Sequence, residues 1–275
     1  MATPLEKTGP SGAPSPLPPD VEQRKEVPSE AALPDPRTRL DVLVAGASIG
    51  VPGTTAATLG MFVEDNATGA LLLLTVGHML GAIEAAGDRV VLKLSPGTPV
   101  LQPGPADGGG DADIIAKVER AVLNERCDAG VAALIGERRY SDLLPDGGRI
   151  RGIALPRLGM RVRAFGRSGW LESTITLIEA ATNVGYLAGV QQRFTGLFMT
   201  EKLSTGGDAG AVVLEADTNR AVGLIFAGSE QASVCIPIAT VLRELDVRIP
   251  GMDQSIEVLE EQMLAELTAV NDTVG

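Results

Sequence analysis

Three separated positions in the chain have the residue types or surroundings that acid–base and acyl-transfer chemistry require. His78 is the single histidine of the 275-residue sequence and directly follows the apolar run ALLLLTVG, where an imidazole would be exposed at a strand end. Asp128 comes immediately before another apolar run, between small residues that let a second side chain approach its carboxylate. Ala209 lies in the glycine-rich stretch STGGDAGAVVL. A single histidine is more often structural than catalytic, so the other two segments decide its meaning.

The glycines around Ala209 indicate a turn that presents backbone donors. Gly206, Gly207 and Gly210 allow backbone conformations that other residues rarely adopt. The N–H groups of Gly207 and Ala209 can therefore point into one cavity, and convergent donors of this kind stabilise an oxyanion. The methyl group of Ala209 can itself do no chemistry.

The order of these segments resembles the trypsin-like (chymotrypsin-fold) serine proteases, and in particular their short, intracellular bacterial type. The family's Gly-Asp-Ser-Gly reads GDAG at 207–210, and TVGH at 75–78 is similar to its Thr-Ala-x-His. DAGVAAL at 128–134 is similar to its aspartate segment, and AVGLIFAG at 221–228 to its specificity-wall strand. The short GDxG element is weak alone, but four motifs in the family's order make a specific match over about residues 40–248.

The resemblance implies a serine endopeptidase that acts on protein or peptide substrates with no cofactor and no metal ion. His78 would be the general base, and Asp128 would fix its tautomer and stabilise the imidazolium. Gly207 and Ala209 would form the oxyanion hole, and position 209 would be the seat of the nucleophilic serine. With alanine there, the chain is expected to be nearly inactive.

Two explanations of Ala209 fit the sequence. Either the natural protein has serine at this position and alanine was introduced to prevent self-cleavage or trap substrate, or the chain is a natural pseudoprotease that binds peptides or acts as a scaffold. The first is favoured because the base, its orienting acid and the donor turn are all retained. Ser204 and Thr205 are not expected to replace the nucleophile, because the family's pattern puts the floor of the specificity pocket there.

The expected substrate-binding residues come from the two segments that would wall this pocket. They are Leu203, Ser204, Phe226, Ala227 and Gly228. The matching base position has no aspartate, so we expect a small or medium apolar residue before the scissile bond. Glu230 would change this expectation if its side chain pointed inward.

The sequence departs from the family in three places. Ala211 and Val212 replace the Gly-Pro that follows the nucleophile turn. The activating amino terminus of the secreted enzymes has no clear counterpart, so Asp208 needs another partner. The family's disulfides are absent, and Cys127 and Cys235 are expected to be buried free thiols, although a disulfide between them stays possible.

Strand-length apolar runs separated by turn residues dominate the chain beyond residue 40 and predict an all-β fold with two six-stranded-type β-barrels. The runs are DVLVAG, TLGMFVED, ALLLLTVG, RVVLKL, GVAALI, RVRAFG, TITLIEA, GAVVLEA, AVGLIFAG and SVCIPI. Two short helices are predicted, in HMLGAIEAAG and in PIATVLRELDV, and an amphipathic helix over 253–270. This last helix could pack on the domain or bind a partner protein.

Composition sets the predicted boundaries. Residues 1–38 are rich in Pro, Ser, Glu and Ala and are interpreted as a disordered arm. The protease-like domain is predicted over 39–250, with the first barrel over about 39–150 and the second over about 151–250. Residues 251–275 would form the C-terminal helix and tail.

The formal net charge of −12 disfavours nucleic acid and anionic membrane surfaces as partners. With neither a signal-like apolar run nor a long uncharged apolar stretch, a cytoplasmic protein is expected. Asp107, Asp111 and Asp113 miss the spacing of a calcium loop, so a solvated loop is expected there. GASIGVPG lacks the spacing and following helix of a phosphate-binding loop.

Overall fold

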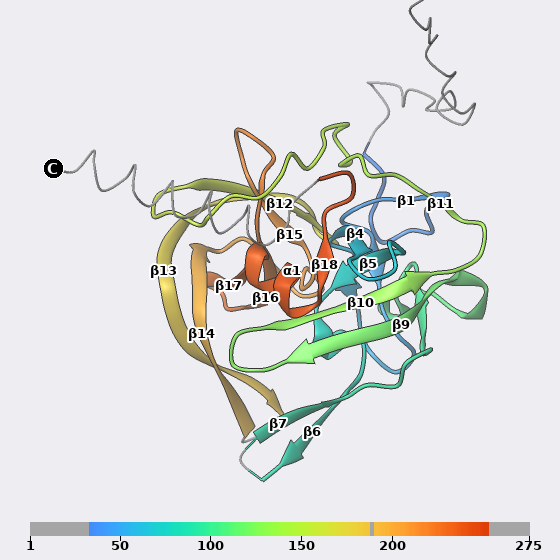
Figure 1. Cartoon of the computed structure of the whole chain (residues 1–275), viewed down its shortest axis with the longest axis horizontal. Coiled ribbons are helices and arrows are strands. Elements are labelled where there is room, and N and C mark those ends of the chain that lie inside the picture. The colour runs from blue at the N-terminus through green and yellow to red at the C-terminus, as the bar shows by residue number, and fades with distance from the viewer. Residues whose placement is uncertain (1–32, 88, 188–189, 253–275) are drawn as a thin grey trace, which may run out of the picture. The chain divides into compact units, whose positions relative to one another are not determined.

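The computed structural model describes residues 33–87, 89–187 and 190–252, and most of them lie in β-strands (Figure 1). Residues 1–32 of the predicted disordered arm therefore lie outside the described residues. The helix predicted over 253–270 also lies outside them. No helix in the described part of the chain is both long and apolar enough to cross a membrane.

The first half of the chain, joined by one strand from near residue 247, forms a six-stranded antiparallel sheet in the order β18-β4-β5-β10-β9-β8. Its strands are β4 (Met61–Asp65), β5 (Leu71–Thr75), β8 (Pro99–Leu101), β9 (Ile114–Leu123), β10 (Asp128–Leu134) and β18 (Val247–Arg248). The edge strand β18 was predicted to belong to the second barrel, but it pairs with β4. The chain returns to the first sheet there because both Arg120 Nε and Nη2 donate to the carbonyl of Leu245.

The second half forms a closed barrel in the order β12-β13-β14-β17-β16-β15. Its strands are β12 (Arg161–Gly166), β13 (Gly169–Leu187), β14 (Val190–Glu201), β15 (Val212–Glu215), β16 (Ala221–Gly228) and β17 (Ala232–Pro237). The helix predicted near residue 240 is confirmed as α1 (Ile238–Glu244), which packs on β16 and β17.

Short elements complete the described chain. Three two-stranded pairs join β1 (Val42–Leu43) to β11 (Arg139–Tyr140), β2 (Ser48–Ile49) to β3 (Ala57–Thr58), and β6 (Ala82–Ala86) to β7 (Arg89–Lys93). Single 3₁₀ turns occur at η2 (Gly77–Met79), η3 (Pro105–Asp107) and η4 (Asp111–Asp113).

The helix predicted in HMLGAIEAAG is wrong. Only the turn η2 is helical, and residues 82–86 form strand β6, paired with β7 from Ala82 opposite Lys93 to Ala86 opposite Arg89. Five residues between Gly81 and Gly87 are too few for a helix that packing does not support. Pairing with the neighbouring β7 therefore overrides the helix preference of the alanines.

Burial explains why the central strands are continuous apolar runs. Leu72, Leu73 and Leu74 of β5 are each at most 2% exposed, so this strand is covered on both faces. Burial of each such side chain contributes about 1.5–3 kcal/mol. A second apolar cluster fills the closed barrel around Val162, Phe198 and Val213.

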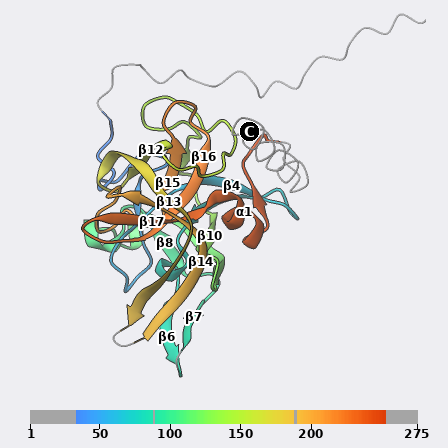
Figure 2. The same cartoon turned by 90° about the vertical axis from the view of Figure 1, so that its left-hand side faces the viewer.

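Two long strands were not predicted. IIAKVERAVL of β9 is rich in helix-forming residues, and VQQRFTGLFMTE of β14 is interrupted by polar residues. Pairing decides both, since β9 lies between β8 and β10 and β14 between β13 and β17. The far ends of β13 and β14 lie beside β6 and β7 of the first half, as Figure 1 and Figure 2 both show.

Part of the predicted arm, residues 33–38, lies within the described structure. Pro36 is buried, and its carbonyl accepts a hydrogen bond from the Ser48 N–H at 2.8 Å. The side chain of Thr38 donates to the carbonyl of Asp35 at 2.9 Å. Residues 35–38 are therefore fixed by a contact with β2 and by their own turn, despite their proline-containing composition.

A nearly buried carboxylate at the end of β4 is expected to contribute to stability. Asp65 accepts from the N–H and the hydroxyl of Thr68, each at 2.8 Å, and pairs with Arg120 at 2.7 Å. The Thr68 hydrogen bonds and then Arg120 lower the pKa of Asp65 to about 2. Its stabilising effect is therefore complete above the ordinary pKa of 3.8 and is lost as pH falls toward 2.

We predict that Asp65→Asn lowers the free energy of unfolding by about 1–3 kcal/mol at pH 7, with a smaller loss at pH 3. Urea unfolding at the two pH values measures the difference. Glu64→Gln, which breaks the more exposed Glu64–Arg248 pair, is the control and should cost about 1 kcal/mol or less. A loss for Asp65→Asn that is the same at both pH values would contradict the prediction.

Candidate active site

His78 and Asp128, predicted to act together, are hydrogen-bonded. Nδ1 of His78 lies 2.6 Å from Oδ2 of Asp128, and the His78 backbone N–H donates to Oδ1 at 2.9 Å. A carboxylate oxygen only accepts, so Nδ1 carries a proton, and in the neutral imidazole Nε2 then keeps its lone pair. This is the tautomer that a general base requires.

The pairing of two strands brings these residues together. β10 runs antiparallel to β5 with Gly130 opposite Thr75, so the first residue of β10 lies beside the turn that leaves β5. Gly77 makes this approach possible, because a Cβ there would lie 3.0 Å from Oδ1 of Asp128 and 2.9 Å from the Ala129 carbonyl. Asp128 is fully buried, whereas the His78 side chain is 19% exposed.

A tyrosine that the sequence did not point to completes this group. The Tyr186 hydroxyl donates to Oδ2 of Asp128 at 2.6 Å, and its ring meets the His78 imidazole edge-on at a centroid distance of 5.5 Å. Burial, followed by the charge of Asp128, raises the pKa of Tyr186. No local sequence signal could have found it, because the contact joins a strand of the second barrel to the first sheet.

The turn that holds Ala209 has the backbone predicted for it. Gly207 and Gly210 have φ angles of +96° and +100°, which side-chain-bearing residues rarely adopt. Thr58 fixes the turn twice: its N–H donates to the Ala209 carbonyl at 2.8 Å and its hydroxyl to the Gly207 carbonyl at 2.9 Å. Within the described residues, the N–H groups of Gly207 and Ala209 have no hydrogen-bond partner.

The same turn packs against the strand that leads to the histidine. A Cβ on Gly210 would lie 2.3 Å from the Thr75 hydroxyl and 2.3 Å from the Thr58 carbonyl. The Thr75 hydroxyl also donates to that Thr58 carbonyl at 2.8 Å. Thr75 precedes His78 by three residues, so their Cα atoms are at most about 11 Å apart. Ala209 itself is partly exposed and packs on the main apolar core.

Asp208, which was expected to need a partner other than an amino terminus, is held by its neighbours. It is fully buried and accepts from the Ser168 N–H and the Thr205 N–H, each at 2.8 Å, and from the Thr205 hydroxyl at 3.1 Å. Two backbone N–H groups and one hydroxyl therefore satisfy the buried carboxylate of this turn.

Arg167 packs against the turn at Gly207. Its Cδ would lie 2.7 Å from a Cβ on Gly207, and its guanidinium donates to both oxygens of Asp107. Burial favours a higher pKa for Asp107, but hydrogen bonds from Arg167 and Ser48 outweigh it and hold the pKa below its usual value. Asp107 thus forms an ion pair with Arg167. Among the described residues, no group of side chains is suited to hold a metal ion.

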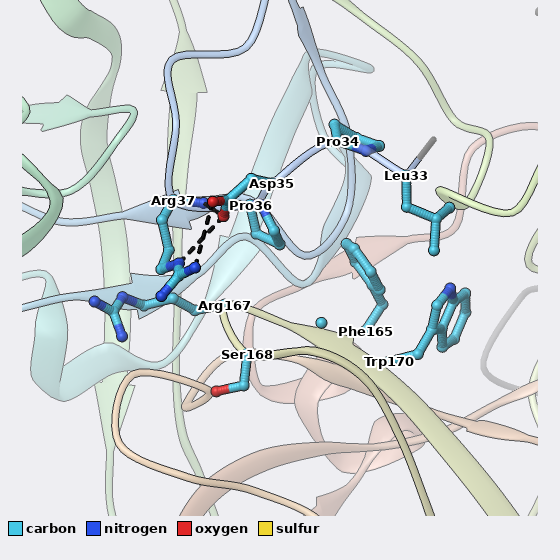
Figure 3. A pocket seen from close by; sticks show the side chains of 10 residues that line it. Leu33, Pro34, Asp35, Pro36, Arg37, Phe165, Arg167, Ser168 and Trp170 are labelled. Atoms are coloured by element: carbon cyan, nitrogen blue, oxygen red, sulfur yellow. Dashed lines mark hydrogen bonds and ion pairs between the residues drawn. The ribbon is translucent and has the colours of Figure 1, made fainter. Parts of the chain in front are cut away.

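A pocket of about 470 Å³ lies next to Arg167. It is lined by residues 33–37 on one side and by Phe165, Arg167, Ser168, Gly169 and Trp170 on the other. Figure 3 shows Phe165 and Trp170 close together below Leu33, and the Asp35–Arg37 pair farther along the same segment. Residues 33–37 therefore lie against the ends of β12 and β13 and the turn between them that carries Arg167.

The five expected substrate-binding residues divide into two groups. The side chains of Leu203 and Phe226 are buried in the cores, at 1% and 3% exposure, which leaves them little surface for a ligand. Ser204, Ala227 and Gly228 keep exposed surface. A Cβ on Gly228 would lie 3.1 Å from the Ser204 hydroxyl, so these residues are adjacent.

Ser233, which the sequence did not point to, joins this group. Its hydroxyl lies 2.7 Å from that of Ser204 and accepts from the Leu203 N–H at 3.0 Å. Glu230 points outward: it is paired with Lys202 at 3.2 Å, and its side chain is 87% exposed. Both cysteines are free and buried, and burial raises the pKa of Cys127 and of Cys235.

Comparison with known proteins identifies the fold. No protein-family model and no curated protein sequence matches the chain. Solved structures do match. Thermobifida fusca protease A has 19% identity and a TM-score of 0.56, covering 75% of this chain and 97% of that protein. For Nocardiopsis protease the values are 19%, 0.55, 74% and 97%, and for Cellulomonas bogoriensis chymotrypsin 17%, 0.54, 76% and 98%. The chain therefore has the two-barrel, all-β chymotrypsin fold, as predicted.

We predict that Thr58→Val loosens the turn that contains Ala209. The change removes the donor to the Gly207 carbonyl and leaves the Arg167 N–H without its acceptor, so stability should fall by about 1–3 kcal/mol. Hydrogen exchange at residues 206–211 should become faster than elsewhere in the second barrel. Thr54→Val, which loses a comparable bond to Val51 away from the turn, should leave exchange at 206–211 unchanged.

Proposed function

We propose that this protein is a serine endopeptidase whose nucleophile position is occupied by alanine in this chain. One observation supports the proposal above others. The chain's single imidazole is held through Nδ1 by a buried carboxylate, and the strand leading to it supports a turn in which two N–H groups have no partner among the described residues. These are the parts of an acyl-transfer site other than the nucleophile.

The mechanism assigns one role to each part. With serine at position 209, Nε2 of His78 takes the hydroxyl proton as the oxygen attacks the scissile carbonyl, and later gives a proton to the leaving amine. Asp128 keeps the imidazole in the required tautomer and stabilises the imidazolium. The N–H groups of Gly207 and of residue 209 donate to the carbonyl oxygen as it becomes negative.

Alanine at position 209 lacks the hydroxyl for the first step. The hydrogen bonds that Thr58 and Asp208 make in this turn, and the bond from the Arg167 N–H to the Thr58 hydroxyl, are nonetheless in place. A site with no catalytic demand has no physical need for a histidine held by a buried aspartate beside a turn with free donors. We therefore infer that the natural residue is serine and that alanine was introduced.

We predict that Ala209→Ser restores proteolysis. Because the three residues act as a unit, turnover of casein or of a fluorogenic peptide library should rise by a factor on the order of a million over the Ala209 chain. Cleavage is measured by peptide release and mass spectrometry, including self-cleavage of the purified protein. A folded Ala209→Ser protein that cleaves nothing would exclude the endopeptidase.

His78→Ala in the Ala209→Ser protein tests the role of the imidazole. Its activity should fall to within about tenfold of the Ala209 chain, because the serine alone is a poor nucleophile. Asp128→Asn should lose less activity, on the order of ten-thousand-fold, since the imidazole is retained in the wrong tautomer. Activity that survives His78→Ala would place the base elsewhere.

Substrate preference follows from the accessible pocket residues. Ser204, Ala227 and Gly228 carry no charge, and Glu230 faces solvent, so we predict cleavage after small or medium apolar residues. Profiling the Ala209→Ser protein with a peptide library measures the preference. Cleavage chiefly after Arg or Lys would show that another surface binds this side chain.

A peptide-binding pseudoprotease is the second candidate, and Ala209 itself is the observation in its favour. In that case the same surface binds peptides without cleaving them. The Ala209→Ser protein would then retain peptides, detected by calorimetry or co-purification, but yield no products.

A further inference from the structure

We propose that Tyr186 is a positioning residue that holds the Asp128 carboxylate in the orientation in which it fixes the His78 imidazole. The structural part of this proposal concerns the hydrogen bonds alone. Its kinetic consequence rests on the proposed endopeptidase function, and the experiments below separate the two.

The geometry puts two donors on one oxygen. Oδ2 of Asp128 is 2.6 Å from Nδ1 of His78 and 2.6 Å from the Tyr186 hydroxyl, while Oδ1 accepts the His78 backbone N–H. Asp128 is fully buried, and within the described residues these are its three donors. Loss of the phenol would remove one donor and leave the carboxylate freer to rotate away from the imidazole.

Ring packing also holds the Tyr186 side chain in place. Its ring meets the His78 ring edge-on at 5.5 Å and packs on Phe194 at 6.3 Å, and Phe194 packs on Phe226 at 4.8 Å. Phe194 is fully buried and Phe226 is 3% exposed. The phenol is thus held by a row of aromatic rings that runs from the main apolar core to the imidazole.

The strand that carries Tyr186 is anchored to the first half near Asp128. β13 and β14 form one hairpin, and the Thr195 N–H of β14 donates to the Glu125 carbonyl at 2.8 Å, three residues before Asp128. The far end of this hairpin also lies beside β6 and β7 (Figure 1). The position of Tyr186, and with it the hydrogen bond to Asp128, therefore depends on how the two halves pack together.

The hydroxyl stays a donor over the range in which such a site works. Burial and the charge of Asp128 raise the pKa of Tyr186, so the phenol remains protonated at neutral and mildly alkaline pH. A tyrosine that served only to fill space would not need its hydroxyl on the carboxylate oxygen that binds the imidazole. The hydroxyl is therefore the atom to test.

The first experiment uses the Ala209 chain and requires no activity. Because the protein has one histidine, every imidazole signal in ¹H–¹⁵N NMR spectra belongs to His78. We expect a downfield Nδ1–H signal in the unchanged chain, and in Tyr186→Phe we expect that signal to move upfield and to exchange faster with water. A signal unchanged in position and exchange would overturn the proposal.

Two control variants separate the hydroxyl from packing. Tyr140→Phe changes the only other tyrosine, which is 52% exposed, and should leave the His78 signal unchanged. Phe194→Leu loosens the aromatic row but keeps the Tyr186 hydroxyl, so it should lower the unfolding temperature and still show the downfield signal. If Phe194→Leu and Tyr186→Phe changed the signal equally, the effect would belong to packing and the proposal would fail.

The second experiment uses the Ala209→Ser protein. Adding Tyr186→Phe should lower kcat by about 10- to 100-fold, the cost of one hydrogen bond to a charged group, with KM changed less than about threefold. An unchanged kcat in an active Ala209→Ser protein would overturn the kinetic part. If Ala209→Ser is inactive while Tyr186→Phe still shifts the NMR signal, the positioning role stands and the endopeptidase proposal fails.

Discussion

The buried carboxylate of Asp128 is the constraint around which the candidate site is organised. A carboxylate without contact to water needs hydrogen-bond donors, and two elements supply three of them: His78 in the turn after β5 gives its backbone N–H and its imidazole, and β13 gives the Tyr186 hydroxyl. Each donor has a second role, since the turn places His78 and Tyr186 belongs to the hairpin that joins the two halves. The hydrogen bonds that the buried Asp128 carboxylate needs therefore fix the positions of its three donors relative to one another.

The two halves of the chain also meet at the turn that holds Ala209. Thr58, from a short strand in the first half, donates to two carbonyls of a turn that belongs to the second. Thr75 contacts the same turn and leads on to His78. The donor turn and the base thus rest on one pair of threonines, so a shift of one half against the other would disturb both. Such sharing suits a site assembled between two β-barrels.

Much of the strand content could be predicted because buried strands need continuous apolar runs, and LLLLT of β5 or AVGLIFAG of β16 admit few other interpretations. The failures share one cause. AIEAA of β6 and IIAKVERAVL of β9 have helix-forming residues, and only pairing with strands distant or adjacent in the chain makes them extended. The placement of Val247 on the first sheet likewise depends on a contact with Asp65 that no local pattern contains.

The sequence by itself determined which chemistry was available: one imidazole at a strand end, one aspartate among small residues, and a glycine-rich turn around Ala209. These follow from residue type and local backbone freedom, which the chain carries in its order. Only the tertiary structure decided that Tyr186 and Thr58 support this chemistry, and that Leu203 and Phe226 lie in the cores. Their roles depend on which surfaces the two halves press together, and that contact is set by packing between segments far apart in the chain.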